Sequence, residues 1–207
     1  MLVYGLISPH PPIIIPAVGG DDTRKVGKTI TALKQASAEL GATKPTRLIM
    51  ISPHEGHGFE VPSYYLIPNL PADIPVEEIL VTQDSYRYYF DLGRTMATKI
   101  ALEPSRVAIV ASGDLSHVLK ADGPYGFNPA GPVLDDMIIE AVRRRDAQTL
   151  LSIDPQTLNN GAECGLRSIL FLLGAIEGSN FQPRVLSYEG PFGVGYMVAT
   201  FKPSNVS

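Results

Sequence analysis

The sequence has few of the features that define several common classes of protein. It contains one cysteine, Cys164, which excludes an internal disulfide and fits a reducing compartment. No apolar run reaches the roughly 20 residues that a membrane-spanning helix needs, and the short apolar start of the chain lacks the basic flank of a signal peptide. We therefore expect a cytoplasmic protein that does not associate with a membrane.

The sequence also lacks a strong excess of charge and any compositional bias. The 207 residues include 21 acidic and 17 basic side chains, and no basic patch is dense enough to predict nucleic-acid binding. No stretch is of low complexity, and 44% of the residues are hydrophobic, which argues against extended disorder. The length suits one domain, which we place at 1–202, followed by a polar tail at 203–207.

Short apolar runs mark the expected strands. Apolar residues at consecutive positions are typical of strands that are covered on both faces of a sheet. Three such strands are predicted at 2–7, 47–51 and 106–111. Three further strands are predicted at 59–67, 184–188 and 194–201, the last two separated by a glycine-rich turn.

Helical patterns separate these strands. Helices are predicted over 22–40, 83–102, 131–145 and 163–176. Asp21 or Asp22 can cap the first helix, and the last is apolar nearly all round, as a buried helix is. The alternation of strands and helices predicts an α/β fold, a single α/β/α sandwich around a mixed, mostly parallel sheet.

The four histidines lie close to the ends of predicted strands. His10 and His54 each end the letters Ile-Ser-Pro-His, and His117 ends Ser-Gly-Asp-Leu-Ser-His after the third strand. Proline directly after a strand ends ladder pairing, and open α/β sheets bind ligands beyond the carboxyl ends of their strands. We therefore expect His10, His54 and His117 to converge. His57 is either a surface residue or a contact to substrate or to a ligand.

A metal held by two imidazoles needs a third ligand, and two adjacent residues can provide it. Glu163 would complete the two-histidine, one-carboxylate triad of non-haem Fe(II) sites. It could instead cap the helix that follows it or pair with Arg167. Cys164 is the alternative ligand and would favour a softer metal, or it is a small buried hydrophobic residue.

Two further carboxylates follow predicted strands. Asp114 precedes His117 by three residues, where it could orient His117 or a ligand, or form a turn. Glu189 precedes the glycine-rich segment 190–195, which could form a cavity wall near substrate or a tight turn. No helix follows Gly193-Val194-Gly195, so this segment is no dinucleotide-binding fingerprint.

Four segments occur in a characteristic order along most of the chain: Ser8-Pro9-His10, Ser52-Pro53-His54, Gly113-Asp114-Leu115-Ser116-His117 and Gly161-Ala162-Glu163. Together they resemble the catalytic subunit of class III extradiol ring-cleavage dioxygenases, the LigB-like family. The resemblance implies Fe(II) held by His10, His54 and Glu163, with His117 as the general acid and base. The substrates would then be a small aromatic diol and O2. The segment 187–196 is similar to the Memo-like branch, which sometimes occurs beside a radical-SAM protein (AmmeMemoRadiSam).

Three functions remain open on the sequence alone. The first is an extradiol dioxygenase that opens a catecholic ring. The second is a Memo-like metal-binding or redox protein without ring cleavage, with Cys164 as a ligand and iron, zinc or copper as the metal. The third is a metal-dependent hydrolase in which His117 activates water. Relatives of this kind imply a homo-oligomer, or a partner subunit or fused domain.

Overall fold

Six strands form one mixed sheet in the computed structural model, which describes residues 1–204 of the chain. The strands lie in the order β3-β2-β4-β1-β6-β5. β3, β2, β4 and β1 run parallel, and β6 is antiparallel to its neighbours β1 and β5. The strands are β1 (Leu2–Ser8), β2 (Arg47–Ser52), β3 (Val76–Leu80), β4 (Val107–Ser112), β5 (Phe181–Glu189) and β6 (Tyr196–Pro203).

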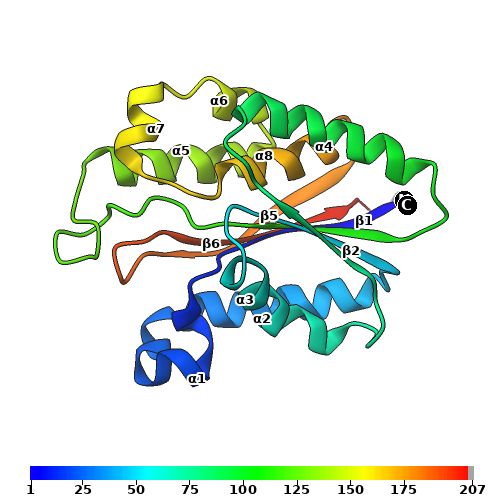
Figure 1. Cartoon of the computed structure of the whole chain (residues 1–207), viewed down its shortest axis with the longest axis horizontal. Helices are drawn as coiled ribbons and strands as arrows, with labels where there is room; N and C mark the ends of the chain where they lie inside the picture. The colour runs from blue at the N-terminus through cyan, green and yellow to red at the C-terminus, as the bar shows by residue number, and fades with distance from the viewer. Residues whose placement is uncertain (205–207) are drawn as a thin grey trace.

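Helices cover both faces of the sheet. One layer holds α2 and α3, with the short α1 beside them, and the other holds α4 to α8 (Figure 1). The helices are α1 (Pro16–Gly19), α2 (Gly27–Ala42), α3 (His57–Leu66), α4 (Tyr86–Ala101), α5 (Ala130–Arg144), α6 (Ala147–Leu151), α7 (Pro155–Gly161) and α8 (Leu166–Ala175). This architecture confirms the predicted α/β/α sandwich.

The side chains of the central strands alternate between two apolar cores. Leu48 and Met50 of β2 pack with α2 and α3, whereas Ile49 and Ile51 pack with α4, α5 and α8. A strand that contributes to a core on each face must be apolar at successive positions. This explains why the continuous apolar runs of β1, β2 and β4 were sufficient to predict these strands.

The predicted strand at 59–67 is wrong, because these residues form most of α3. Their buried side chains include Phe59, Val61, Pro62, Tyr65 and Leu66, and this three-to-four spacing packs one helix face on the sheet. The sixth strand is instead β3, a short edge strand in which Val76 and Leu80 are exposed. Its alternating burial hides it from a search for apolar runs.

The start of the first predicted helix also differs from expectation. Residues 20–26 form a 3-10 helix, and α2 begins at Gly27 without a side-chain cap. Asp21 and Asp22 instead form exposed ion pairs with Arg24 and Lys25. The predicted tail at 203–207 begins with the last residue of β6, and its final three residues lie outside the described part of the chain. Among residues 1–204, no helix has both the length and the apolar character needed to cross a bilayer.

Candidate metal centre

The candidate site lies where three parallel strands end. β4 pairs with both β1 and β2, so their carboxyl ends meet at one edge of the sheet. Pro9 and Pro53 follow β1 and β2 and cannot donate to the ladder, so the chain leaves the sheet there. His10 and His54 come next, and both lie at the same edge of the sheet, as the repeated Ser-Pro-His motif predicts.

Three ligand atoms converge beyond this edge. One nitrogen each of His10 and His54 and the sulfur of Cys164 all lie within 4.8 Å of one another. Nε2 of His10 is 3.7 Å from Sγ of Cys164. Tetrahedral bonds of about 2.1 Å to nitrogen and about 2.3 Å to sulfur place such atoms about 3.6 Å apart. The exposed His54 can turn to close the remaining gap, so this donor set fits a single metal ion.

A chain of hydrogen bonds fixes the tautomer of His10. Pro62, inside α3, has no amide hydrogen, so the carbonyl of Gly58 one turn earlier lacks its helical donor. The hydroxyl of Ser112 donates to this carbonyl at 2.5 Å. Ser112 Oγ must therefore accept the 2.9 Å bond from Nδ1 of His10. Nε2 keeps its lone pair and lies 3.7 Å from the Cys164 sulfur, so it is available as a metal ligand.

Burial keeps the His10 ring neutral. The side chain is 2% exposed, and burial, followed by the neighbouring His54, His57 and His117, lowers its pKa to about 3. Burial is also the main cause that lowers the pKa of His54 and His117. Neutral imidazole is the form that binds a metal, so these rings need no proton loss at neutral pH.

Asp114 lies beside His10 rather than His117. Its Oδ1 accepts the backbone N–H of His10 at 3.0 Å, and its Oδ2 is 4.0 Å from Nε2 of the same residue. Burial raises the pKa of Asp114 to about 7. Of the two orienting roles open on the sequence, this geometry favours the one toward the ligand His10.

Cys164 packs against the backbone of Asp114. Its sulfur accepts the Asp114 amide at 3.3 Å, and the amide of Gly165 donates to the Asp114 carbonyl at 2.9 Å. This close approach of the two backbone segments requires glycine at position 113. A Cβ there would lie 2.2 Å from Cα of Gly165. Burial raises the pKa of the Cys164 thiol, so the sulfur would lose its proton on binding a metal.

Glu163, the expected third ligand, is not part of the group of ligand atoms that His10, His54 and Cys164 form. Its carboxylate accepts the backbone N–H of Leu166 at 2.6 Å and the hydroxyl of Tyr86 at 2.9 Å. It thus caps the first turn of α8, the alternative role considered for it on the sequence. Arg167 does not pair with it in the described chain and instead lies 4.4 Å above the Tyr86 ring. The geometry therefore favours Cys164 over Glu163 as the third ligand.

His117 is held at the rim of the site. Its Nδ1 donates to the carbonyl of Ala162 at 2.7 Å, since a carbonyl can only accept. Ala162 has φ +49 and ends α7, which turns this carbonyl toward His117. Nε2 is therefore the basic nitrogen. The imidazole and the exposed Tyr125 ring form a T-shaped pair with 5.4 Å between centroids.

The two remaining candidates differ in position. The His57 ring lies 5.3 Å from the His10 ring and 5.2 Å from the His54 ring, between centroids, so it belongs to the cluster. Glu189 accepts hydrogen bonds from the amide and hydroxyl of Thr29. It therefore joins β5 to the start of α2, and the expectation that it contacts substrate or a ligand is not supported by this geometry.

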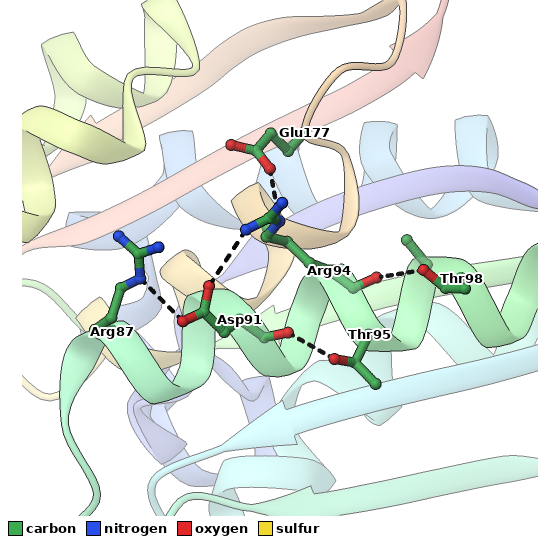
Figure 2. Close-up of a pocket in the computed structure, with 8 residues that line it drawn as sticks. Arg87, Asp91, Arg94, Thr95, Thr98 and Glu177 are labelled. Atoms are coloured by element: carbon green, nitrogen blue, oxygen red, sulfur yellow. Dashed lines mark hydrogen bonds and ion pairs between the residues drawn. The ribbon is translucent and has the colours of Figure 1, made fainter.

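A separate groove on the outer face of α4 has the character of a solvated surface (Figure 2). Arg87 pairs with Asp91, and Arg94 pairs with both Asp91 and Glu177, all on exposed side chains. Exposed ion pairs of this kind contribute little to the stability of the folded protein. The chemistry-bearing residues therefore gather at the strand ends and not in this groove.

The fold and this donor cluster define an α/β protein with a candidate metal centre. Comparison with known families shows which family the chain belongs to. Residues 56–199 match the family described as the catalytic LigB subunit of aromatic ring-opening dioxygenase. The chain belongs to this family, which confirms the resemblance. The matched residues include His117 and Cys164 and begin after His54.

Two individual proteins are similar to the chain. Protein CA_C1420 of Clostridium acetobutylicum is 26% identical over an alignment that covers 92% of this chain and 55% of that protein, so the chain spans about half the length of this relative. The crystal structure of the uncharacterized protein JW3007 from Escherichia coli K12 matches with a TM-score of 0.57 at 14% identity. That match covers 97% of this chain and 99% of the other, and it supports the fold alone.

Proposed function

We propose that this chain is a metal-binding redox protein of the LigB family, with one iron or copper ion held by His10, His54 and Cys164. The observation that carries the proposal is the position of the Cys164 sulfur, 3.7 Å from Nε2 of His10. The carboxylate of Glu163 is meanwhile engaged by Leu166 and Tyr86. Among the functions open on the sequence, this arrangement favours the Memo-like one.

Each side chain has a defined part in this proposal. His10 and His54 would bind through neutral imidazole nitrogens, and Ser112 would hold the Nδ1 proton of His10 in place. A bound iron or copper ion would supply one-electron redox chemistry. His117 would take up or release a proton at Nε2, while the Ala162 carbonyl keeps its ring oriented.

The thiol shifts the expected metal preference. Two imidazoles and a carboxylate are typical of non-haem Fe(II), whereas a thiolate favours softer ions such as Cu(I), with zinc as a further candidate. The buried thiol would be ionised only by the metal, so binding should release a proton. Iron stays in the proposal because the family is described as the catalytic LigB subunit of aromatic ring-opening dioxygenase, and non-haem Fe(II) is a typical metal of oxygenases.

Two neighbouring substitutions test the proposed ligands. Protein purified anaerobically should contain one metal ion per chain by elemental analysis, and Cys164→Ser should lose most of it. Glu163→Gln is the matched control, because Gln can still accept from Leu166 or Tyr86, and it should retain the metal. If Glu163→Gln loses the metal while Cys164→Ser keeps it, the proposed third ligand is wrong.

Extradiol ring cleavage is the second candidate function, favoured by the family match and by His117, whose Nδ1 donates to the Ala162 carbonyl and leaves Nε2 as the basic nitrogen. Its test is anaerobic loading with Fe(II), followed by air and a panel of catechols, with a yellow ring-fission product as the readout. His117→Ala should lower turnover about 10²–10⁴-fold while the iron content is unchanged. If no catechol is cleaved by the wild-type protein, this candidate is excluded and the metal-binding proposal stands.

A further inference from the structure

His57 lies beside the proposed ligands but has no part in the proposed site. Between centroids, its ring is 5.3 Å from the ring of His10 and 5.2 Å from that of His54, and those two rings are 5.2 Å apart. The three imidazoles therefore form a nearly equilateral triangle. Such regular spacing needs an explanation, because the rings of His54 and His57 have no hydrogen bond to the described residues that would hold them at these distances.

The spacing is that of three imidazoles around one ion. Bonds of about 2.1 Å from a tetrahedral metal to three imidazole nitrogens place the ring centroids about 5.3 Å apart. The Cys164 sulfur is in position for the fourth corner, 3.7 Å from Nε2 of His10. Together the four residues provide three nitrogens and one sulfur, a donor set that fills a tetrahedral site.

His57 is also free to move. It is the first residue of α3, its side chain is exposed, and its ring has no hydrogen bond to the described residues. Its ligand nitrogens lie outside the 4.8 Å group that His10, His54 and Cys164 form. The ring must therefore turn before it can bind, and nothing in the described chain holds it back.

We propose that His57 is a fourth, exchangeable ligand that closes the metal site in the resting protein and withdraws when an external ligand binds. This inference rests on the proposed function, because it requires the site formed by His10, His54 and Cys164. Closed four-coordinate sites are typically structural, whereas catalytic sites keep an open position. An exchangeable fourth ligand would make the same site closed at rest and open in use.

Cobalt substitution tests the proposal without any assay of activity. The apoprotein is loaded anaerobically with Co(II), and the imidazole ligands are counted by X-ray absorption. Wild-type protein should show three imidazoles and one sulfur, and His57→Ala should show two imidazoles and one sulfur. Loss of an outer partner already weakens metal binding about 10–100-fold, so loss of this direct ligand should weaken Co(II) binding at least about 10-fold.

Two further measurements make the test specific. Added imidazole should restore the wild-type visible spectrum to His57→Ala, because it can fill the vacated position. Glu60→Gln, an exposed change in the first turn of the same helix, is the matched control and should match wild type in both measurements. Far-UV circular dichroism checks that His57→Ala is folded, with His57→Gln as a second variant.

The outcomes separate this inference from the proposed function. Wild-type protein that binds no Co(II) overturns the metal site itself, and with it the role of His57. Wild-type protein that binds Co(II) through two imidazoles overturns only the His57 assignment. The same conclusion follows if His57→Ala retains three imidazoles and wild-type affinity.

Discussion

The two sides of the candidate site hold their histidines in different ways. On the side of β1 and β4, His10 and His117 each donate an Nδ1 proton to a fixed acceptor, one a hydroxyl and the other a backbone carbonyl. On the side of α3, His54 and His57 are exposed, and their rings have no hydrogen bond to the described residues. The first side can define where an ion sits, and the second can adjust to what else binds.

Among the predictions that test this difference, removal of the Ser112 hydroxyl, the acceptor of the His10 ring, should have the largest effect. Ser112→Ala leaves Nδ1 of His10 and the carbonyl of Gly58 without partners in a buried position. We expect the free energy of unfolding to fall by about 1–3 kcal/mol and metal affinity to fall about 10–100-fold. Chemical denaturation and metal titration measure the two effects.

The matched control for this substitution is Ser168→Ala. Ser168 is also a buried serine, but its hydroxyl has no hydrogen-bond partner among the described residues. Its removal should therefore cost little stability and leave metal affinity unchanged. Equal losses in the two variants would show that the Ser112 hydroxyl has no special role at His10.

The pH dependence of stability should reveal the burial of Asp114 and His10. The folded-state pKa of Asp114 is raised to about 7, so its contribution to stability is present at low pH and is lost as the pH rises through about 7. The pKa of His10 is lowered to about 3, so its contribution is present above about 6.5 and is lost on acidification. Between about pH 4 and 6.5 the two slopes oppose each other.

Asp114→Asn removes one of these opposing slopes. Relative to wild type, the apoprotein variant should gain stability as the pH rises from about 4 to 7, by up to about 1.4 kcal/mol per pH unit. Urea denaturation across this range measures the difference, and the exposed Asp122→Asn should follow wild type. Parallel profiles for wild type and Asp114→Asn would show that burial does not raise the pKa of Asp114.

The smallest expected effect on stability belongs to the exposed side. His54→Ala removes a ring without hydrogen-bond partners, so the apoprotein should change by less than about 0.5 kcal/mol. The same variant should lose the metal, because His54 is one of three proposed ligands. A large loss of apoprotein stability in His54→Ala would remove the distinction between the two sides.

The sequence predicts most of this fold because the central strands are apolar on consecutive positions. β1, β2 and β4 contribute to both cores, and such strands leave a clear pattern. β3 leaves none, because it lies at the edge of the sheet with every second side chain exposed. Residues 59–67 mislead because they are rich in aromatic and β-branched residues, although their burial follows helical spacing.

The histidines of the site are also predictable, but the third ligand is not. The repeated Ser-Pro-His letters after two strands bring His10 and His54 together without any knowledge of tertiary structure. Glu163 and Cys164 are adjacent, so only the direction of the chain after α7 decides which one faces the histidines. That direction depends on Ala162 in the left-handed region and on the close contact of Gly113 with Gly165. Neither feature leaves a signal in residue spacing.

Pro62 has a consequence that reaches beyond its own helix. Because Pro62 leaves the Gly58 carbonyl without a helical donor, that carbonyl accepts from Ser112, which in turn accepts the Nδ1 proton of the buried His10. Any other residue at position 62 would bring an amide hydrogen that competes with Ser112 for the same carbonyl. Such a change would leave His10, His54 and Cys164 themselves unaltered and still shift which nitrogen of His10 carries its proton.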